Sequence, residues 1–244
     1  MEPKLPDFLN SAPCPELDDG HVLVWSGSLD LAPQALETCA SILSPDELDR
    51  AARFKFEQDS NHFVAARGML RFFLGFYTRC SPSELEFTYG DKGKPELIHA
   101  SDTLKFNVSH SHGIGAWALG LVPLLGVDVE WTLRKVDLDR VGKRFFSENE
   151  WASLANLSAA ERRAGFFNCW TRKEAFVKAL GDGLSFSLKA FDVSTGNEAE
   201  ITRIDGDQDP AKWALHAFEP WATYAGALAA VGQVQFHHFV LTDV

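Results

Sequence analysis

Long apolar runs are missing from this sequence of 244 residues. Residues 1–20, MEPKLPDFLNSAPCPELDDG, contain no apolar core of signal-peptide length. No later stretch approaches the roughly 20 consecutive apolar residues that a membrane-spanning helix needs. These absences argue against a secreted protein and against a membrane protein, so we expect a cytoplasmic location.

Cysteine is scarce as well, and the four residues Cys14, Cys39, Cys80 and Cys169 are widely scattered. No two of them form a Cys-x-x-Cys pair, and their spacing is irregular. The pattern therefore favours free thiols over disulfides or a zinc site.

Positive charge is in deficit, because 23 Lys and Arg face 34 Asp and Glu, for a net charge of −11. This balance argues against a protein whose main task is to coat nucleic acid. The basic residues nevertheless cluster, which indicates a local anionic ligand, although a solvated helix face explains any one of them equally well. The clusters are Arg50, Arg53, Lys55, Arg67 and Arg71, then Lys92 and Lys94, and finally Arg172, Lys173 and Lys178.

Hydrophobic periodicity predicts a mixed α+β protein. Alternating patterns predict strands in 21–29, 85–97, 104–120 and 124–131, and helical spacing predicts long helices over 59–74 and 165–181. Ser44 with Glu47, and Ser147 with Glu150, have the spacing of capping boxes at helix starts. Short apolar runs separated by turn residues predict several antiparallel strands after residue 190.

The segment GVDVEW, residues 126–131, combines an apolar and an acidic strand face. Asp128 and Glu130 share one face, about 6–7 Å apart at ~3.3 Å per residue. Two carboxylates on one face repel each other unless a cation lies between them, and oxygen ligands of this kind suit magnesium. The alternative is a strand whose polar face lies in water.

The segment FNVSHSHG, residues 106–113, ends a strand in a His-Ser-His turn. His110 and His112 could form a metal-binding pair, or Ser109 and His110 could donate hydrogen bonds to a phosphate. A catalytic Ser-His pair is disfavoured, because no Gly-x-Ser-x-Gly elbow surrounds Ser109.

YGDKGKPEL, residues 89–97, is a glycine-rich turn that contains two lysines. It lacks the spacing of a Walker loop, but its glycines allow the backbone to approach an anion closely. A plain hairpin turn is the alternative.

WTRKEAFVKALGDGL, residues 170–184, reads as a helix with charges near its apolar side. Lys173 falls inside the apolar arc, whereas Glu174 and Lys178 stand together at its edge as an i, i+4 pair. One interpretation is an exposed ion pair beside a lysine whose charged end reaches water. The other brings Glu174 to the carboxylates of Asp128 and Glu130 as a third metal ligand.

In this order, YGDKGKP, FNVSHS, GVDVE, RFFSENE and WTRKEAFVKALGDGL resemble the double-lobed, Sfp-type 4′-phosphopantetheinyl transferases, with the last motif similar to their W-x-x-K-E-A subgroup. RFKFEQDSNHFVAARGMLR resembles their N-terminal lobe, and the likeness covers roughly residues 44–193. It implies an α+β pseudo-dimer of two similar lobes, each a small, mainly antiparallel sheet on a long helix. We expect a polar lead over 1–20, lobes over 21–122 and 123–244, and the active site between them.

The resemblance also implies a reaction: transfer of 4′-phosphopantetheine from coenzyme A to a serine of an apo acyl or peptidyl carrier protein, releasing 3′,5′-ADP. Asp128, Glu130 and Glu174 match the ligands of Mg²⁺, for which Mn²⁺ is the alternative. Asp128, Glu174 and Lys178 are the expected catalytic residues, with Glu174 as general base. The positions that match coenzyme A contacts are Arg50, Arg53, Arg67, Lys92, Gly93, Lys94, Pro95, Asn107, Ser109, His110, Lys173 and Lys178.

We expect a monomer that binds neither nucleic acid nor membrane, and Lys173 could instead orient the helix. Glu47 departs from the family pattern, because it puts an acid where a base would help to bind phosphate. Two alternatives stay open. One is a metal-dependent phosphohydrolase for a nucleotide-like substrate, built on His110, His112, Asp128 and Glu130. The other is a non-catalytic coenzyme A-binding module.

Overall fold

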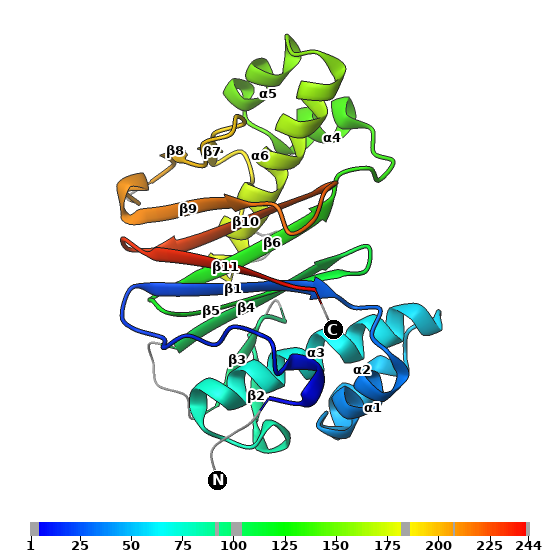
Figure 1. Ribbon diagram of the computed structural model, residues 1–244. Coiled ribbons are helices and arrows are strands. Elements are labelled where there is room, and N and C mark those ends of the chain that lie inside the picture. The colour runs from blue at the N-terminus through cyan, green and yellow to red at the C-terminus, as the bar shows by residue number, and fades with distance from the viewer. Residues whose placement is uncertain (1–4, 91–92, 99–103, 182–185, 207, 243–244) are drawn as a thin grey trace.

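Two sheets organise the computed structural model, which describes residues 5–90, 93–98, 104–181, 186–206 and 208–242. The first sheet has the order β11-β1-β5-β4, and its strands are β11 (Gln235–Leu241), β1 (His21–Ser28), β5 (Ile114–Leu121) and β4 (Leu104–Ser111). The second has the order β6-β10-β9, with β6 (Leu125–Trp131), β10 (Tyr224–Val231) and β9 (Trp213–Phe218). Two small antiparallel pairs are β2 (Phe87–Tyr89) with β3 (Pro95–Leu97), and β7 (Phe191–Val193) with β8 (Ile201–Ile204). The α+β prediction is confirmed (Figure 1).

The last strand corrects the expectation of an antiparallel C-terminal region. β11 pairs in parallel with β1, from His21 opposite Gln235 to Gly27 opposite Leu241. Both edges of β10 are already occupied by β6 and β9, so the chain cannot extend the second sheet beside β10. The free edge of β1 accepts it instead, and the C-terminal end of the chain joins the N-terminal sheet (Figure 1).

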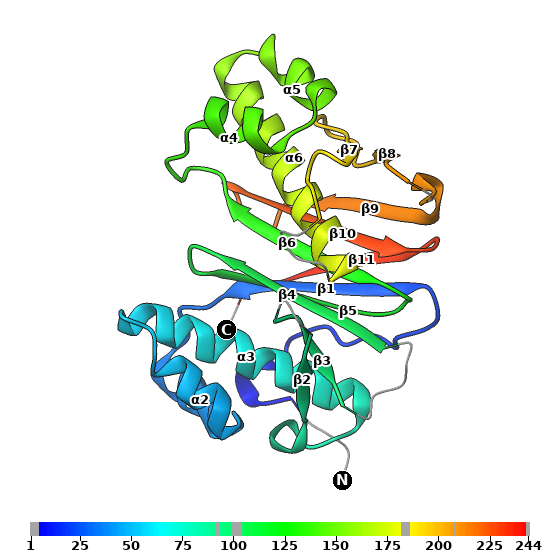
Figure 2. The same cartoon turned by 180° about the vertical axis from the view of Figure 1, so that it is seen from behind.

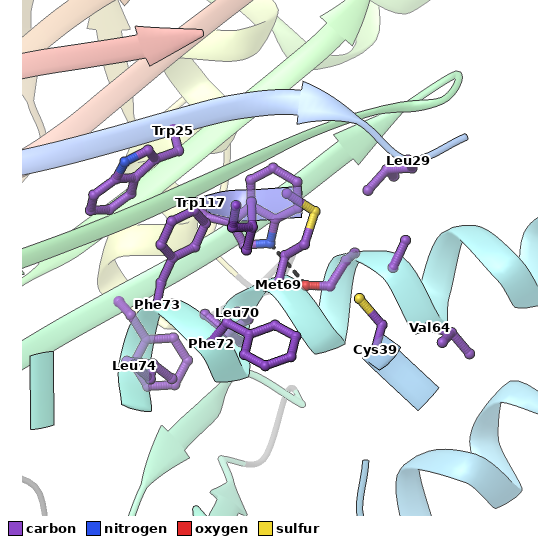
Figure 3. Packing of buried hydrophobic residues seen from close by; sticks show 14 of the residues in the cluster. Trp25, Leu29, Cys39, Val64, Met69, Leu70, Phe72, Phe73, Leu74 and Trp117 are labelled. Carbon is purple, nitrogen blue, oxygen red and sulfur yellow. Dashed lines mark hydrogen bonds between the residues drawn. The ribbon is translucent and has the colours of Figure 1, made fainter. Parts of the chain in front are cut away.

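The N-terminal lobe consists of the first sheet and its helices α1 (Pro33–Ser41), α2 (Pro45–Ala51) and α3 (Glu57–Thr78). The predicted capping box starts α2, since Ser44 and Glu47 bond reciprocally across its first turn. On α3 the buried face meets the sheet, where Trp25 stacks on Phe73 with ring centroids 4.4 Å apart. The indole Nε1 of Trp117 donates to the carbonyl oxygen of Ala66 at 2.8 Å, which ties β5 to the helix backbone (Figure 3).

The C-terminal lobe consists of the second sheet, the β7–β8 pair and helices α4 (Leu138–Phe145), α5 (Glu148–Ala155) and α6 (Ala159–Leu180). The predicted capping box of Ser147 and Glu150 begins α5, and Ser158 begins α6 in the same way. α6 lies across one face of the second sheet (Figure 2) and ends at Gly181, whose φ of 82° suits glycine. Within the described part of the chain, no helix combines the length and apolar character needed to cross a membrane.

The two sheets pack face to face between α3 and α6. Val22 and Val24 of β1 point away from α3 and meet Val127 of β6 and Leu228 of β10 in one buried cluster. The opposite faces of the same strands contact the two helices. β6 therefore has an apolar face toward the N-terminal lobe, and its residues Asp128 and Glu130 project from the other face.

Lys173 is the buried charge of α6, and the C-terminal lobe surrounds it with acceptors. Its side chain is 0 % exposed, and Nζ lies 2.7 Å from Oε1 of Glu150, which is also buried. Nζ donates to the carbonyl oxygens of Leu188 at 2.6 Å and Phe191 at 2.7 Å. An ammonium has three protons, so all of them are used inside the lobe. Lys173 therefore fixes α6 against α5 and β7.

We predict that Lys173→Met destabilises the protein by roughly 3–5 kcal/mol, because it leaves the Glu150 carboxylate buried without its cation. Urea denaturation measures this loss. Lys189→Met is the matched control, since Lys189 is exposed and its ammonium bonds one carbonyl of α4. We expect that variant to stay within about 1 kcal/mol of wild type. Equal stability of the two variants would contradict the role given to Lys173.

Candidate active site

A cavity of about 380 Å³ lies where α2, α3, β4 and the end of α6 come together. Segments far apart in the sequence contribute to its wall, so the fold brings residues of separate motifs to one cavity. The residues of the predicted site that line it are Arg50, Arg67, Gly93, Lys94, Pro95, Asn107, Ser109, His110 and Lys178.

Two predicted coenzyme A contacts are not part of this wall, and a third cannot be placed in it or outside it. Arg53 is exposed and is absent from the cavity lining. Lys92 lies outside the described residues. Lys173 is enclosed in the C-terminal lobe with its ammonium bonded to Glu150 and two carbonyls, so the structure places it away from the cavity, contrary to the prediction. Its alternative assignment, orientation of the helix, agrees with these contacts.

Beside the cavity, β6 and α6 bring three carboxylates together. Asp128 and Glu130 project from the same face of β6, and Glu174 comes from α6. Burial, reinforced by the charge of Asp128, raises the pKa of Glu174 to about 7. Burial and then Asp128 also raise the pKa of Glu130. The three groups therefore repel one another in a partly buried place.

Lys178 is the cation that faces this group. Its Nζ lies 2.7 Å from Oδ1 of Asp128 and donates to Oγ of Ser109 at 2.8 Å. Ser109 Oγ in turn donates to the same carboxylate oxygen at 2.9 Å. One oxygen of Asp128 is thus fully engaged, while the side chain of Lys178 is 30 % exposed and lines the cavity.

Glu130 is held by three donors on the protein. Ser111 Oγ donates to Oε2 at 2.9 Å, whereas Trp170 Nε1 and Arg134 Nη2 approach Oε1, each at 3.1 Å. Trp170, the first residue of the segment WTRKEA, therefore donates a hydrogen bond directly to Glu130. Arg134 and Ser111 were missed by the sequence analysis. The i, i+4 relation of Glu130 to Arg134 and the alternation of Ser111 with Ser109 were the available signals.

The structure tests whether this group fits a cation. Oδ2 of Asp128 and Oε1 of Glu174 are buried and have no hydrogen-bond partner among the described residues. Unpaired buried carboxylate oxygens are costly, so these two atoms fit the chemistry of a hard divalent cation. Across the described ranges, however, no three His, Cys, Asp or Glu side chains already stand as a metal cluster. Two ligand atoms are therefore free, and Glu130 is tied to its own donors.

Two arginines, Arg50 of α2 and Arg67 of α3, belong to the wall of the cavity. Arg67 lines the wall, and its buried Nη1 has no partner among the described residues. Its Nε pairs with Oε1 of Glu47 at 3.2 Å, and Glu47 also pairs with Arg71 at 2.7 Å. Glu47 is 1 % exposed. Glu47 therefore orients Arg67 and Arg71 through buried ion pairs, and it does not line the cavity itself.

Lys94 contributes backbone to the wall, but its ammonium crosses to the other lobe. Nζ donates to the carbonyl oxygens of Lys178 at 2.7 Å, Leu125 at 3.1 Å and Ala179 at 3.2 Å. A cation at the C-terminal end of α6 complements the helix dipole. Burial lowers the pKa of Lys94 to about 8. Lys94 thus fastens the turn at 93–95 to the helix that holds Lys178.

The two histidines of the His-Ser-His turn have different surroundings. His110 lines the cavity, and burial followed by the charge of Lys178 lowers its pKa. His112 has φ 47°, and its ring stacks on Trp131 with centroids 3.8 Å apart and planes 3° apart. A His110–His112 metal pair, on which the phosphohydrolase alternative was built, is therefore not favoured by this arrangement.

We predict that the metal-free protein loses stability because of Glu174 as the pH rises from about 4.5 to about 7. The folded state holds this proton more tightly than the unfolded state, so raising the pH through that window favours unfolding. Denaturation with a chelator present, at pH values below and above the window, measures the loss. Glu174→Gln should remove it, and Glu148→Gln, at an exposed carboxylate, should keep it. An identical pH profile for wild type and Glu174→Gln would contradict the assignment.

Comparisons with known proteins identify the family of this chain. Residues 124–229 match the 4′-phosphopantetheinyl transferase superfamily, and residues 30–118 match the N-terminal region of 4′-phosphopantetheinyl transferases. The 4′-phosphopantetheinyl transferase HetI of Nostoc sp. is 34 % identical over 90 % of this chain and 92 % of its own. Sfp of Bacillus subtilis, also a 4′-phosphopantetheinyl transferase, is 28 % identical over 70 % of this chain and 75 % of its own. The chain belongs to the 4′-phosphopantetheinyl transferase superfamily, of the Sfp type.

Proposed function

We propose that the protein transfers the 4′-phosphopantetheine group of coenzyme A to a serine of an apo carrier protein and releases 3′,5′-ADP. The observation that carries this proposal is a cavity, in a member of this superfamily, that is lined by Arg67 and by Lys178, the partner of Asp128. Among the described residues, Arg67 Nη1, Asp128 Oδ2 and Glu174 Oε1 are buried without a hydrogen-bond partner. One side of the site suits phosphate and the other suits a cation. Coenzyme A, with its pyrophosphate and 3′-phosphate, needs both.

The cationic residues of the wall would bind coenzyme A. Arg67 offers an Nη1 that has no partner in the described part of the chain, and the half-buried side chain of Lys178 also lines the cavity. Arg50 adds a third positive charge, placed over the ring of Phe63 at 5.4 Å from its centroid. The glycine turn at 93–95 lets backbone approach the ligand closely. These groups come from both lobes, so one chain completes the site.

Asp128 and Glu174 would hold a magnesium ion through the oxygens that have no partner among the described residues, and Glu130 would be the third ligand, oriented by Ser111, Trp170 and Arg134. Such an ion would polarise the pyrophosphate and offset its negative charge, and Mn²⁺ could take its place. Ser109 and Lys178 keep the Asp128 carboxylate in one orientation through its other oxygen. The protein thus supplies a prearranged ligand pair.

The carrier serine is the nucleophile, which explains why no Ser or Cys of the enzyme needs to react. Its oxygen forms a bond to the phosphorus that bears the pantetheine arm. The bond between that phosphorus and the bridging oxygen breaks, and the bridging oxygen leaves with 3′,5′-ADP. Glu174 would accept the serine proton as the general base. Lys178 stands where it can neutralise the 3′,5′-ADP that leaves.

We also propose that the enzyme works as a monomer, because residues of both lobes line one cavity. The lobes cover 21–122 and 123–244, except that β11 belongs to the sheet of the first lobe. The cytoplasm is the proposed location. All four cysteines are free, which suits a reducing compartment.

Mass spectrometry of an apo carrier protein, incubated with the enzyme, coenzyme A and Mg²⁺, tests the function. We expect the carrier to gain the mass of one phosphopantetheine group and 3′,5′-ADP to appear in equal amount. Hydrolysis of coenzyme A without any change of the carriers tested would favour the phosphohydrolase. Binding of coenzyme A without chemistry would favour the binding module.

Asp128→Asn keeps the shape of the side chain but removes its charge, so it weakens both the ion pair with Lys178 and the free cation ligand. We predict a fall in kcat of at least about 10²-fold, in line with the loss of a preorganised electrostatic group. Asp139→Asn is the matched control, because Asp139 is exposed and pairs with Arg162 on the outer helices. Initial rates at saturating coenzyme A measure both variants. A kcat for Asp128→Asn within a few-fold of the control refutes the assignment.

A further inference from the structure

β4 and β6 are edge strands of different sheets, and side chains join them. Three alternate residues of β4 accept hydrogen bonds from three alternate backbone N–H groups of β6. The bonds run from Val127 to Oδ1 of Asn107 (2.9 Å), from Val129 to Oγ of Ser109 (3.3 Å) and from Trp131 to Oγ of Ser111 (3.1 Å). We call these three bonds the side-chain ladder. It has the two-residue period of a strand pair, with side chains in place of backbone carbonyls.

The ladder answers a general need of an edge strand. β6 pairs with β10 on one side only, which leaves alternate N–H groups of its other edge without a backbone acceptor. β4 is likewise the last strand of the first sheet. The side chains of Asn107 and Ser109 are buried, so water would not readily take their place. The register of β6 against β4 therefore depends on these three side chains.

Two of the three residues also hold a carboxylate. A serine hydroxyl can accept one hydrogen bond and donate another at the same time. Ser109 accepts from Val129 and donates to Asp128, and Ser111 accepts from Trp131 and donates to Glu130 at 2.9 Å. The backbone bond fixes where each hydroxyl oxygen stands, and the remaining proton then points to the carboxylate. In each serine, the same hydroxyl oxygen therefore helps to fix both the register of β6 and the orientation of one carboxylate.

We propose that Ser111 is a positioning residue for the transfer reaction, and this rests on the proposed function. It acts through Glu130, together with Trp170 and Arg134, and it does not line the cavity. Without the hydroxyl, Trp131 N–H loses its acceptor and Oε2 of Glu130 loses its donor. Glu130 then turns relative to Asp128 and Glu174, while the coenzyme A wall is unchanged.

Ser111→Ala tests the proposal in the full-length enzyme, with Ser111→Thr as the conservative variant that keeps the hydroxyl. Ser28→Ala is the matched control, since its hydroxyl accepts the backbone N–H of Asp30 and donates to no carboxylate of the described residues. Three measurements are made: amide hydrogen exchange at Trp131, Mn²⁺ affinity of the metal-free enzyme, and kcat with KM for coenzyme A.

For Ser111→Ala we expect faster exchange at Trp131 and about tenfold losses in Mn²⁺ affinity and in kcat, as is usual when the support of a metal ligand is removed. KM for coenzyme A should stay within about twofold, because the wall does not include Ser111. Ser111→Thr should recover most of each loss, and Ser28→Ala should show none.

Unchanged Mn²⁺ affinity and kcat in Ser111→Ala would overturn the proposal, and so would a raised KM with normal kcat, which would make Ser111 a substrate contact. If the alanine variant does not fold, Ser111→Cys is judged by the same measurements. A wild-type enzyme that modifies no carrier refutes the proposed function. The exchange and Mn²⁺ measurements on its variants would still decide whether Ser111 positions Glu130.

Discussion

The ion pair between Lys178 and Asp128 joins the end of α6 to the strand that holds two of the three carboxylates. Lys178 pairs with Asp128 and Arg134 pairs with Glu130, so two cations face three acidic groups in a place that water reaches only partly. The consequence is visible in the buried oxygens without partners and in the pKa of Glu174, which rises to about 7. A proton on Glu174 or a bound cation would supply the missing positive charge. The two would compete, because both occupy the same carboxylate.

The two lysines of α6 show how one helix can serve core and site at once. Lys173 and Lys178 stand five residues apart, so they point in different directions around the helix. The first is enclosed by Glu150 and two carbonyls, and the second reaches Asp128 at the cavity. The buried ion pair of Lys173 thus fixes α6, and α6 places the partly exposed Lys178 at the cavity. Glu174 follows Lys173 on α6, so the same contacts also fix the direction in which its backbone presents the carboxylate.

Local chemistry made much of this fold predictable, because capping boxes at Ser44 and Ser147 and the apolar period of α3 depend on neighbouring residues. The parallel pairing of β11 was not predictable, since it follows from which strand edge is left free after the sheets form. The carboxylates and Lys178 could be named from their motif. The partners Arg134 and Ser111 could not, because their contacts exist only once β4, β6 and α6 have met.

The side-chain ladder explains how the carboxylates of β6 come to lie beside a cavity whose wall includes β4. Backbone pairing of β4 with β6 would place the strands about 4.7–4.9 Å apart and would use the edge N–H groups for carbonyls alone. Side chains reach farther than carbonyls, so the strands stand apart and hydroxyl groups occupy the space between them. Each hydroxyl then satisfies a backbone donor and still has a proton for a carboxylate. A seam of this kind converts two sheet edges, which otherwise invite aggregation, into an ordered row of polar groups beside the cavity.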